Sequence, residues 1–175
     1  IKFSTKLIKA LAITRMPFLS AVLMPAFIGG AYAYHYELGT PGAFNWWLFT
    51  LAVIGVALLH LGSNVMNDYF DVKDGTDGAN NDYFLQFSGG SRAIELGLIT
   101  LEGTKRLGLA LIAGAALIGL YLTAVTGWVT LLIGLAGLAI GYLYTAPPVR
   151  LVARKGLGEL GIALAFGPLV TLGIV

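Results

Sequence analysis

Long apolar runs alternate with short polar connections along the chain. Each of five runs approaches the roughly 20 residues that a helix needs to cross about 30 Å of hydrocarbon. They cover residues 17–34, 46–67, 107–125, 128–146 and 157–175. Their length and glycine content favour helices over barrel strands, in which apolar and polar residues would alternate. The pattern predicts an all-α fold, a polytopic transmembrane helical bundle with about five spans, in which Pro25 and Pro168 kink their helices.

The composition excludes a soluble globular domain. Hydrophobic residues make up 57% of the chain and charged residues 11%, whereas a soluble domain carries about 25% charged residues. The mean hydropathy is +0.82. The 24 glycines suit close helix packing in lipid. Because there is no cysteine, disulfides and thiolate metal sites are excluded.

The two ends of the chain predict further features. It begins at Ile1 and ends at Val175 inside an apolar run, and we expect it to be part of a longer protein. Residues 1–15 carry lysines at helical spacing, which predicts an amphipathic helix on the membrane surface. A signal peptide is the alternative, but the first apolar run is longer than a usual signal core and more spans follow it.

The charges predict an orientation. All eleven cations fall on one side of the five-span arrangement, and the opposite connections, residues 35–45 and 126–127, contain none. By the positive-inside rule the basic side is cytoplasmic. An aromatic belt marks the other interface: Tyr32, Tyr34, Tyr36, Trp46, Trp47 and Trp128. Residues 74–106 then form a long cytoplasmic connection, a candidate cap over a functional site.

Acidic residues gather where the second apolar run ends, in "NVMNDYFDVKDGTDGAN" (64–80). If that helix continues to about Phe70, Asn64, Asp68 and Asp71 stand at i, i+4 and i+7 on one face. Two unit charges 4 Å apart interact by about 4 kcal/mol at an effective dielectric constant near 20, and a divalent cation reverses the sign of that interaction. Oxygen ligands of this kind select Mg²⁺, Ca²⁺ or Mn²⁺.

A solvated acidic helix end is the plain alternative for this cluster. Acidic caps favour the N-terminus of a helix, whereas these residues lie at a C-terminal end, where the dipole disfavours them. Ionisable residues at membrane depth are functional candidates. An EF-hand does not fit, because Gly75 comes too early and no glutamate closes the loop.

The stretch "NVMNDYFD" resembles the first aspartate-rich motif of the UbiA superfamily of intramembrane prenyltransferases, whose usual form is Asn-x-x-x-Asp-x-x-x-Asp. Asn64 and Asp68 match it, and Asp71 comes one residue early. This shorter spacing, with a further Asp77, is similar to the branch that acts on 1,4-dihydroxy-2-naphthoate in menaquinone synthesis. The stretches "GGSRAIELGLIT" (89–100), "YTAPPVRL" (144–151) and "GLGELGIALAFGPL" (156–169) also resemble that branch.

The resemblance implies a fold of roughly nine helices and an activity. Mg²⁺ held by Asp68, Asp71 and Asp77 would bind an isoprenyl diphosphate, and an electron-rich aromatic acceptor would attack the allylic carbocation left when diphosphate departs. The enzyme would lie in the cytoplasmic membrane with its active site facing the cytoplasm, and nucleic acid is not an expected partner. A lysine that some hydroxybenzoate enzymes carry is replaced by Tyr142, and the second aspartate motif would lie beyond Val175.

Several cations and one aromatic residue are candidates for substrate binding beside Asn64. Arg15 and Arg92 could clamp diphosphate oxygens, or serve as interfacial anchors. Lys73 could bind diphosphate or relieve charge within the acidic cluster. Tyr142, like the neighbouring Tyr144, could stabilise a carbocation through its ring face.

The remaining polar residues of interest are expected to be structural. His60, one turn before Asn64, is expected to be a packed and hydrogen-bonded residue. Arg150, Arg154 and Lys155 are expected to be topology signals.

Other functions would share parts of this pattern. A sister branch with the same chemistry prenylates glycerol-phosphate lipids. CDP-alcohol phosphotransferases also place aspartates at a cytoplasmic helix end, but their Asp-Gly-x-x-Ala-Arg pattern is not met by "DGTDGAN". A cation-coupled transporter would place its ion site near mid-membrane, whereas this cluster lies at one edge. The sequence sets neither the prenyl chain length nor the acceptor.

Overall fold

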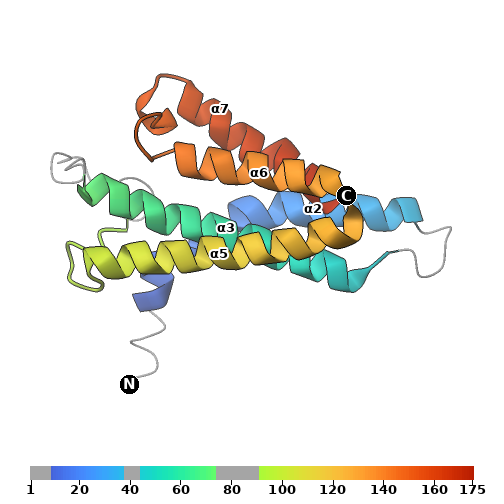
Figure 1. Cartoon of the computed structure of the whole chain (residues 1–175), viewed down its shortest axis with the longest axis horizontal. Helices are drawn as coiled ribbons and strands as arrows, with labels where there is room; N and C mark the ends of the chain where they lie inside the picture. Colours follow the sequence, from blue (N-terminus) through green and yellow to red (C-terminus); the bar gives the residue numbers. More distant parts are fainter. Residues whose placement is uncertain (1–8, 38–43, 74–90) are drawn as a thin grey trace.

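The computed structural model describes residues 9–37, 44–73 and 91–175, and every regular element within them is helical. After a helical stretch at residues 9–14, the elements in chain order are η1 (Met16–Leu19), α2 (Ser20–Glu37), α3 (Trp46–Lys73), α5 (Leu101–Thr126), α6 (Trp128–Leu143), η2 (Leu151–Ala153), α7 (Leu157–Leu164), η3 (Ala165–Leu169) and α8 (Val170–Ile174). The long helices run lengthwise through one bundle (Figure 1), which confirms the predicted all-α helical class.

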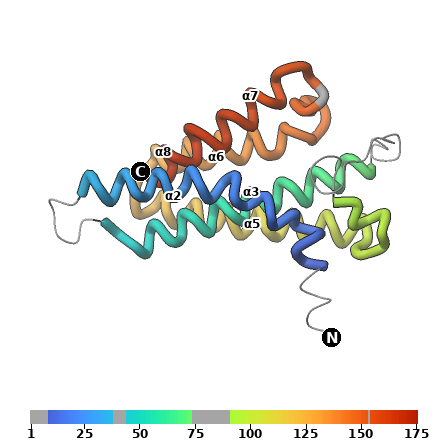
Figure 2. The backbone as a smooth tube through the Cα atoms, turned by 180° about the vertical axis from the view of Figure 1, so that it is seen from behind, coloured from blue at the N-terminus to red at the C-terminus, as the bar shows by residue number. Residues whose placement is uncertain are grey.

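Helices α3 and α5 lie side by side along much of their length, as both views of the backbone show (Figures 1 and 2). Glycine permits this close approach. A Cβ added at Gly62 of α3 would lie 2.8 Å from Ile112 Cγ1 and 3.2 Å from the Ile112 backbone nitrogen on α5. Small residues at helix contacts allow such packing in lipid, where van der Waals contact replaces the hydrophobic drive for association.

Four helical segments are long and apolar enough to cross a membrane: Met16–Glu37, Trp46–Lys73, Leu101–Thr126 and Leu157–Ile174. The span expected at residues 128–146 is shorter than predicted, because α6 ends at Leu143 and has 16 residues. "APP" at residues 146–148 stops it, since proline cannot continue a helix and restricts the residue before it. The described residues therefore contain four full-length candidate spans and one shorter apolar helix.

Helix α3 is longer than the apolar run that predicted it. Its 28 residues correspond to about 42 Å at 1.5 Å per residue, whereas the hydrocarbon core is about 30 Å thick. The helix passes Phe70 and ends at Lys73, so the condition for placing Asp68 and Asp71 on it is met. Its acidic end therefore extends beyond the length needed to cross the apolar layer.

Helix α5 begins earlier than the sequence suggested. Residues 101–106, expected to belong to the connection 74–106, form its first turns instead. The Thr100 side chain accepts a hydrogen bond from Gly103 N at 3.0 Å and thus caps the helix. Glu102 pairs with Arg106 one turn later at 3.0 Å. Residues 91–100 form turns, and residues 74–90 lie outside the described residues.

The segment before α2 changes direction sharply. Residues 9–14 are helical, while Arg15 adopts the left-handed conformation, with φ 51° and ψ 42°, immediately before η1. Ile13 and Thr14 are buried, so this short helix packs against the protein on one side. The remainder of the expected amphipathic helix, residues 1–8, lies outside the described residues.

Proline affects the two predicted helices differently. Pro168 lies in η3, a five-residue π-helical turn between α7 and α8. Such a turn accommodates a residue that has no N–H to donate. Pro25 lies inside α2, whose helical assignment continues through it, and a kink there stays a prediction.

Charged and aromatic residues mark opposite ends of the bundle. Lys73 ends α3, Lys105 lies in the first turns of α5, and Arg150 lies between α6 and α7. These helix ends all lie toward the left in Figure 1. At the other end, the Tyr34 and Trp46 rings are 5.7 Å apart between α2 and α3, and Trp128 is exposed at the turn before α6. The described residues therefore follow the charge asymmetry read from the sequence.

Candidate functional site

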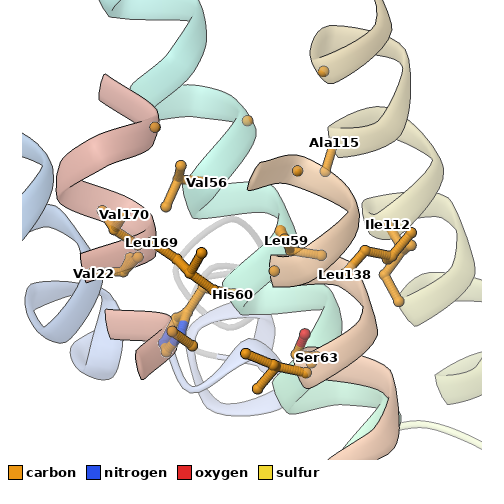
Figure 3. A pocket seen from close by; sticks show the side chains of 18 of the residues that line it. Val22, Val56, Leu59, His60, Ser63, Ile112, Ala115, Leu138, Leu169 and Val170 are labelled. Carbon is orange, nitrogen blue, oxygen red and sulfur yellow. The ribbon is translucent and has the colours of Figure 1, made fainter. Parts of the chain in front are cut away.

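A cavity of about 810 Å³ lies between the helices and extends along them. Its wall is apolar over most of its length, and Figure 3 shows Val56 and Leu59 of α3, Leu138 of α6 and Leu169 facing it. Polar side chains lie at the end near the C-terminus of α3: Arg15, Asn64, Asn67, Asp71, Tyr144 and Arg150. The cavity can therefore take a molecule with a polar head and a long apolar body.

The polar end of this cavity rests on two turns of α3. Asn64, Asn67 and Asp71 stand at i, i+3 and i+7 and line the cavity. The Asn67 amide donates to Asp71 Oδ2 at 3.0 Å, which fixes that carboxylate relative to the helix. Asn67 thus lines the cavity between Asn64 and Asp71, and Asp68 is not among the lining residues; its predicted role stays a prediction.

Asp68 lies beside the cavity rather than in its wall. Its side chain is 6% exposed and forms an ion pair with Arg15, whose Nη2 lies 2.8 Å from Asp68 Oδ1. The Ser91 backbone N–H points at both Asp68 oxygens, at 3.2 and 3.3 Å. A buried carboxylate requires such partners. Asp68 thus joins three segments: the turn before α2, the end of α3 and the segment that leads to α5.

Arg15 is held in place by its backbone as well as by this pair. Its left-handed conformation turns the chain between residues 9–14 and η1, and its side chain reaches both Asp68 and the cavity. A non-glycine residue in this conformation is uncommon and costs energy. Arg92 and Arg150 share the feature, with φ of 51° and 45°.

The other predicted substrate-binding residues lie outside the cavity wall. Lys73 is exposed, with its Nζ 5.8 Å from the centre of the Tyr69 ring. Arg92 forms an ion pair with Glu95. The Tyr142 ring is half-exposed and packs edge-on against Phe70, 6.3 Å between centres. Their roles toward a substrate stay predictions.

Tyr144 and Arg150 line the cavity in their place. Burial raises the pKa of the Tyr144 phenol above its usual value, and the negative charges of Glu159 and Asp71 add to this effect. Tyr144 therefore remains protonated at neutral pH and can donate a hydrogen bond. Sequence reasoning considered Tyr144 only for its ring face and took Arg150 as a topology signal; the turns at residues 144–149 bring both to the cavity.

His60 is a packed, hydrogen-bonded residue, as expected. It is 7% exposed, its Nε2 lies 3.2 Å from Asn64 Nδ2, and its ring packs edge-on against Phe166, 5.1 Å between centres.

The described residues contain no group of three or more histidine, cysteine, aspartate or glutamate side chains arranged to hold a metal ion. Asp77, predicted as a metal ligand, and the neighbouring Asp74 lie outside the described residues. At the polar end of the cavity, the described residues that could offer oxygen ligands to a metal ion are Asp71, through its carboxylate, and Asn64 and Asn67, through their amides. Asp68 lies alongside.

Comparison with known proteins shows which family the chain resembles. The UbiA prenyltransferase family profile matches residues 18–175. A 1,4-dihydroxy-2-naphthoate octaprenyltransferase of Bacillus subtilis (strain 168) is 31% identical over 166 residues, covering 91% of this chain and 48% of that protein. A 2-carboxy-1,4-naphthoquinone phytyltransferase of Synechocystis sp. is 30% identical over 162 residues, covering 91% and 47%. The chain spans about half the length of these curated relatives. No solved structure matches it significantly.

Proposed function

Because the chain belongs to the UbiA prenyltransferase family, we propose that it serves to transfer an isoprenyl group from a prenyl diphosphate to an aromatic acceptor of the 1,4-dihydroxy-2-naphthoate class. The naphthoate and naphthoquinone names of the two relatives support this acceptor. Those names carry different prenyl groups, octaprenyl and phytyl, so the chain length of the donor stays open.

One observation carries the proposal: a single cavity combines an apolar wall with a polar end. Val56, Leu59 and Leu138 offer the apolar wall that an isoprenoid tail requires, while Asn64 and Asp71 lie at the polar end. A prenyl diphosphate has this division between a charged head and a hydrocarbon tail. The volume of about 810 Å³ lies within the range of about 300–1,000 Å³ found for ligand sites.

The donor set at the polar end fits Mg²⁺. This ion is commonly bound by one or two carboxylates together with substrate phosphates, and it keeps several waters. Asp71 supplies such a carboxylate, and Asn64 and Asn67 supply amide oxygens from the same helix. Asp68 lies alongside, with its charge balanced by Arg15. When bound, the ion would stabilise negative charge on the departing diphosphate.

The side chains of the chain itself carry the remaining tasks. Arg15 and Arg150 place positive charge at the polar end, where diphosphate oxygens would lie. Tyr144 offers a protonated phenol there as a hydrogen-bond donor, and its ring face suits an adjacent carbocation. The apolar wall would keep water away from that carbocation, which water would otherwise quench.

The membrane setting follows the same reasoning. The helices and family membership support an integral membrane protein. We place the polar end of the cavity at the cytoplasmic face of the cytoplasmic membrane, because the cations gather at that end and positive charge marks the cytoplasmic side.

The test is a transfer assay with the purified protein. Radiolabelled prenyl diphosphates of several lengths are supplied with Mg²⁺ and one acceptor at a time: 1,4-dihydroxy-2-naphthoate, 4-hydroxybenzoate or a glycerol-phosphate lipid. We expect label in a prenylated naphthoate, and none when EDTA removes Mg²⁺. The proposal would be overturned if product formed only with the glycerol-phosphate lipid, or if no acceptor in the panel gave a product.

A further inference from the structure

His60 holds a defined place between three elements of the cavity wall. Figure 3 shows its ring on the side of the cavity where Val22 of α2 and Leu169 and Val170 lie. The ring hydrogen-bonds the backbone of Phe18 in η1 and packs edge-on against Phe166 in η3. Its Nε2 lies 3.2 Å from Asn64 Nδ2, one turn further along α3.

The contact with Asn64 determines the hydrogen-bonding role of the His60 Nε2 atom. A neutral imidazole has one N–H donor and one acceptor nitrogen. The Asn64 Nδ2 amide group can only donate, so the ring nitrogen that it faces accepts. Nε2 faces Asn64 and is then the acceptor. Only the NH₂ group of the Asn64 amide can donate to it.

The orientation of the Asn64 amide follows. With its NH₂ group turned to His60, its carbonyl oxygen is available to the cavity that Asn64 lines. The reversed amide would place two lone pairs against each other at His60 and present N–H groups to the cavity. An N–H group repels a cation, whereas a carbonyl oxygen binds one.

We propose that His60 is a positioning residue that sets the Asn64 amide with its oxygen toward the cavity, as a ligand for a divalent cation. This inference rests on the proposed function, because it assigns Asn64 to the cation of that reaction. It gives the buried histidine a role toward the site that packing alone would not require. Partners that orient a ligand in this way typically change metal affinity by about 10–100-fold when they are removed.

A set of variants, with Asn64→Ala as the reference for loss of the Asn64 ligand, separates orientation from packing. His60→Leu keeps an apolar side chain of similar size and removes both ring nitrogens. His60→Gln retains one acceptor and one donor. Asn64→Asp presents oxygen on both sides of the carboxylate, so its orientation no longer matters, and it is made alone and together with His60→Leu. His35→Leu is the matched control, because His35 is exposed on α2 outside the cavity wall.

The readout is Mn²⁺ binding to purified protein in detergent, followed by electron paramagnetic resonance, with the melting temperature recorded for each variant. We expect His60→Leu to weaken Mn²⁺ binding by about tenfold or more, and His60→Gln and His35→Leu to remain within about threefold of the unmodified protein. In the Asn64→Asp background, adding His60→Leu should change the affinity by less than about threefold.

Two results would overturn the inference. In the first, His60→Leu binds Mn²⁺ as the unmodified protein does while Asn64→Ala binds it weakly. In the second, His60→Leu weakens binding equally with asparagine and with aspartate at position 64, which indicates a packing effect. Mn²⁺ binding is measured without turnover, so the two proposals can fail separately. If the variants show the expected Mn²⁺ affinities but the protein transfers no prenyl group, this inference stands and only the proposed function is refuted.

Discussion

Replacing Arg15 by methionine tests the ion pair that links the turn before α2 to the end of α3. Methionine is unbranched like arginine and equally disfavoured at the left-handed backbone of residue 15, so the change removes mainly the charge. Asp68 would keep the Ser91 N–H but lose its cation partner at 2.8 Å. Breaking a buried pair costs about 3–5 kcal/mol, and we expect about 3 kcal/mol because Arg15 is partly exposed.

The second change, Asp68→Asn, distinguishes a charge effect from a loss of packing. In the unmodified protein it should cost about 1–2 kcal/mol, because the Arg15 side chain is 21% exposed and can still reach water. In the Arg15→Met background it should instead stabilise by about 1–2 kcal/mol, because it removes a buried charge that has lost its cation partner. The amide oxygen introduced by this change can still accept from the Ser91 N–H in both backgrounds.

Unfolding in mixed detergent micelles by added dodecyl sulfate, followed by circular dichroism, measures these differences. Arg106→Met is the control, because Arg106 and Glu102 form an ion pair whose side chains are 78% and 60% exposed, and such pairs contribute less than about 1 kcal/mol. If Asp68→Asn is equally destabilising with and without Arg15, the two residues do not interact as described.

Asp71→Asn should lower the rate of Mg²⁺-dependent prenyl transfer by about 100-fold or more, because loss of a direct metal ligand should cost more than loss of a residue that only orients a ligand. An unchanged rate would show that Asp71 is not part of the site. Gly62→Ala should destabilise the α3 and α5 contact by about 1–3 kcal/mol. Gly119→Ala, where an added Cβ meets nothing within 4 Å, should change stability by no more than about 1 kcal/mol; equal effects in the same unfolding assay would contradict the packing at Gly62. Cysteines at Glu37 and Leu96 should react with an impermeant maleimide from opposite sides of the membrane, the latter from the cytoplasm, and labelling from one side would refute the topology.

Most of the fold could be predicted because each helix carries its own signal. The apolar runs gave the four long segments, and the capping threonine and Glu102 of "TLEG" mark the start of α5, although it was not predicted there. The short α6 was also readable in part, since two prolines follow it. These are local effects, in which residues close together in the sequence determine the backbone conformation.

The candidate site depended on features without a local signal. The spacing of Asn64, Asn67, Asp68 and Asp71 fits a helical face in more than one way, and only the packing of α3 decides which side chains line the cavity. The partner of Asp68 is Arg15, 53 residues away, brought there by a left-handed turn that no glycine marks. The turns after α6 likewise decide that Tyr144 rather than Tyr142 faces the cavity.

The π-helical turn of η3 makes the last apolar segment sensitive to its length. An α-helix advances about 100° per residue, and a π-turn takes up additional chain within one turn. The faces of α7 and α8 are therefore out of phase with those of one uninterrupted helix. On one side of the turn Gly158 packs against Leu151, and on the other Thr171 approaches Gly29. A single-residue deletion within Ala165–Leu169 would rotate α8 relative to α7, so that one of the two helices would lose its present packing contacts. Substitutions there would leave the relative rotation of the two helices unchanged.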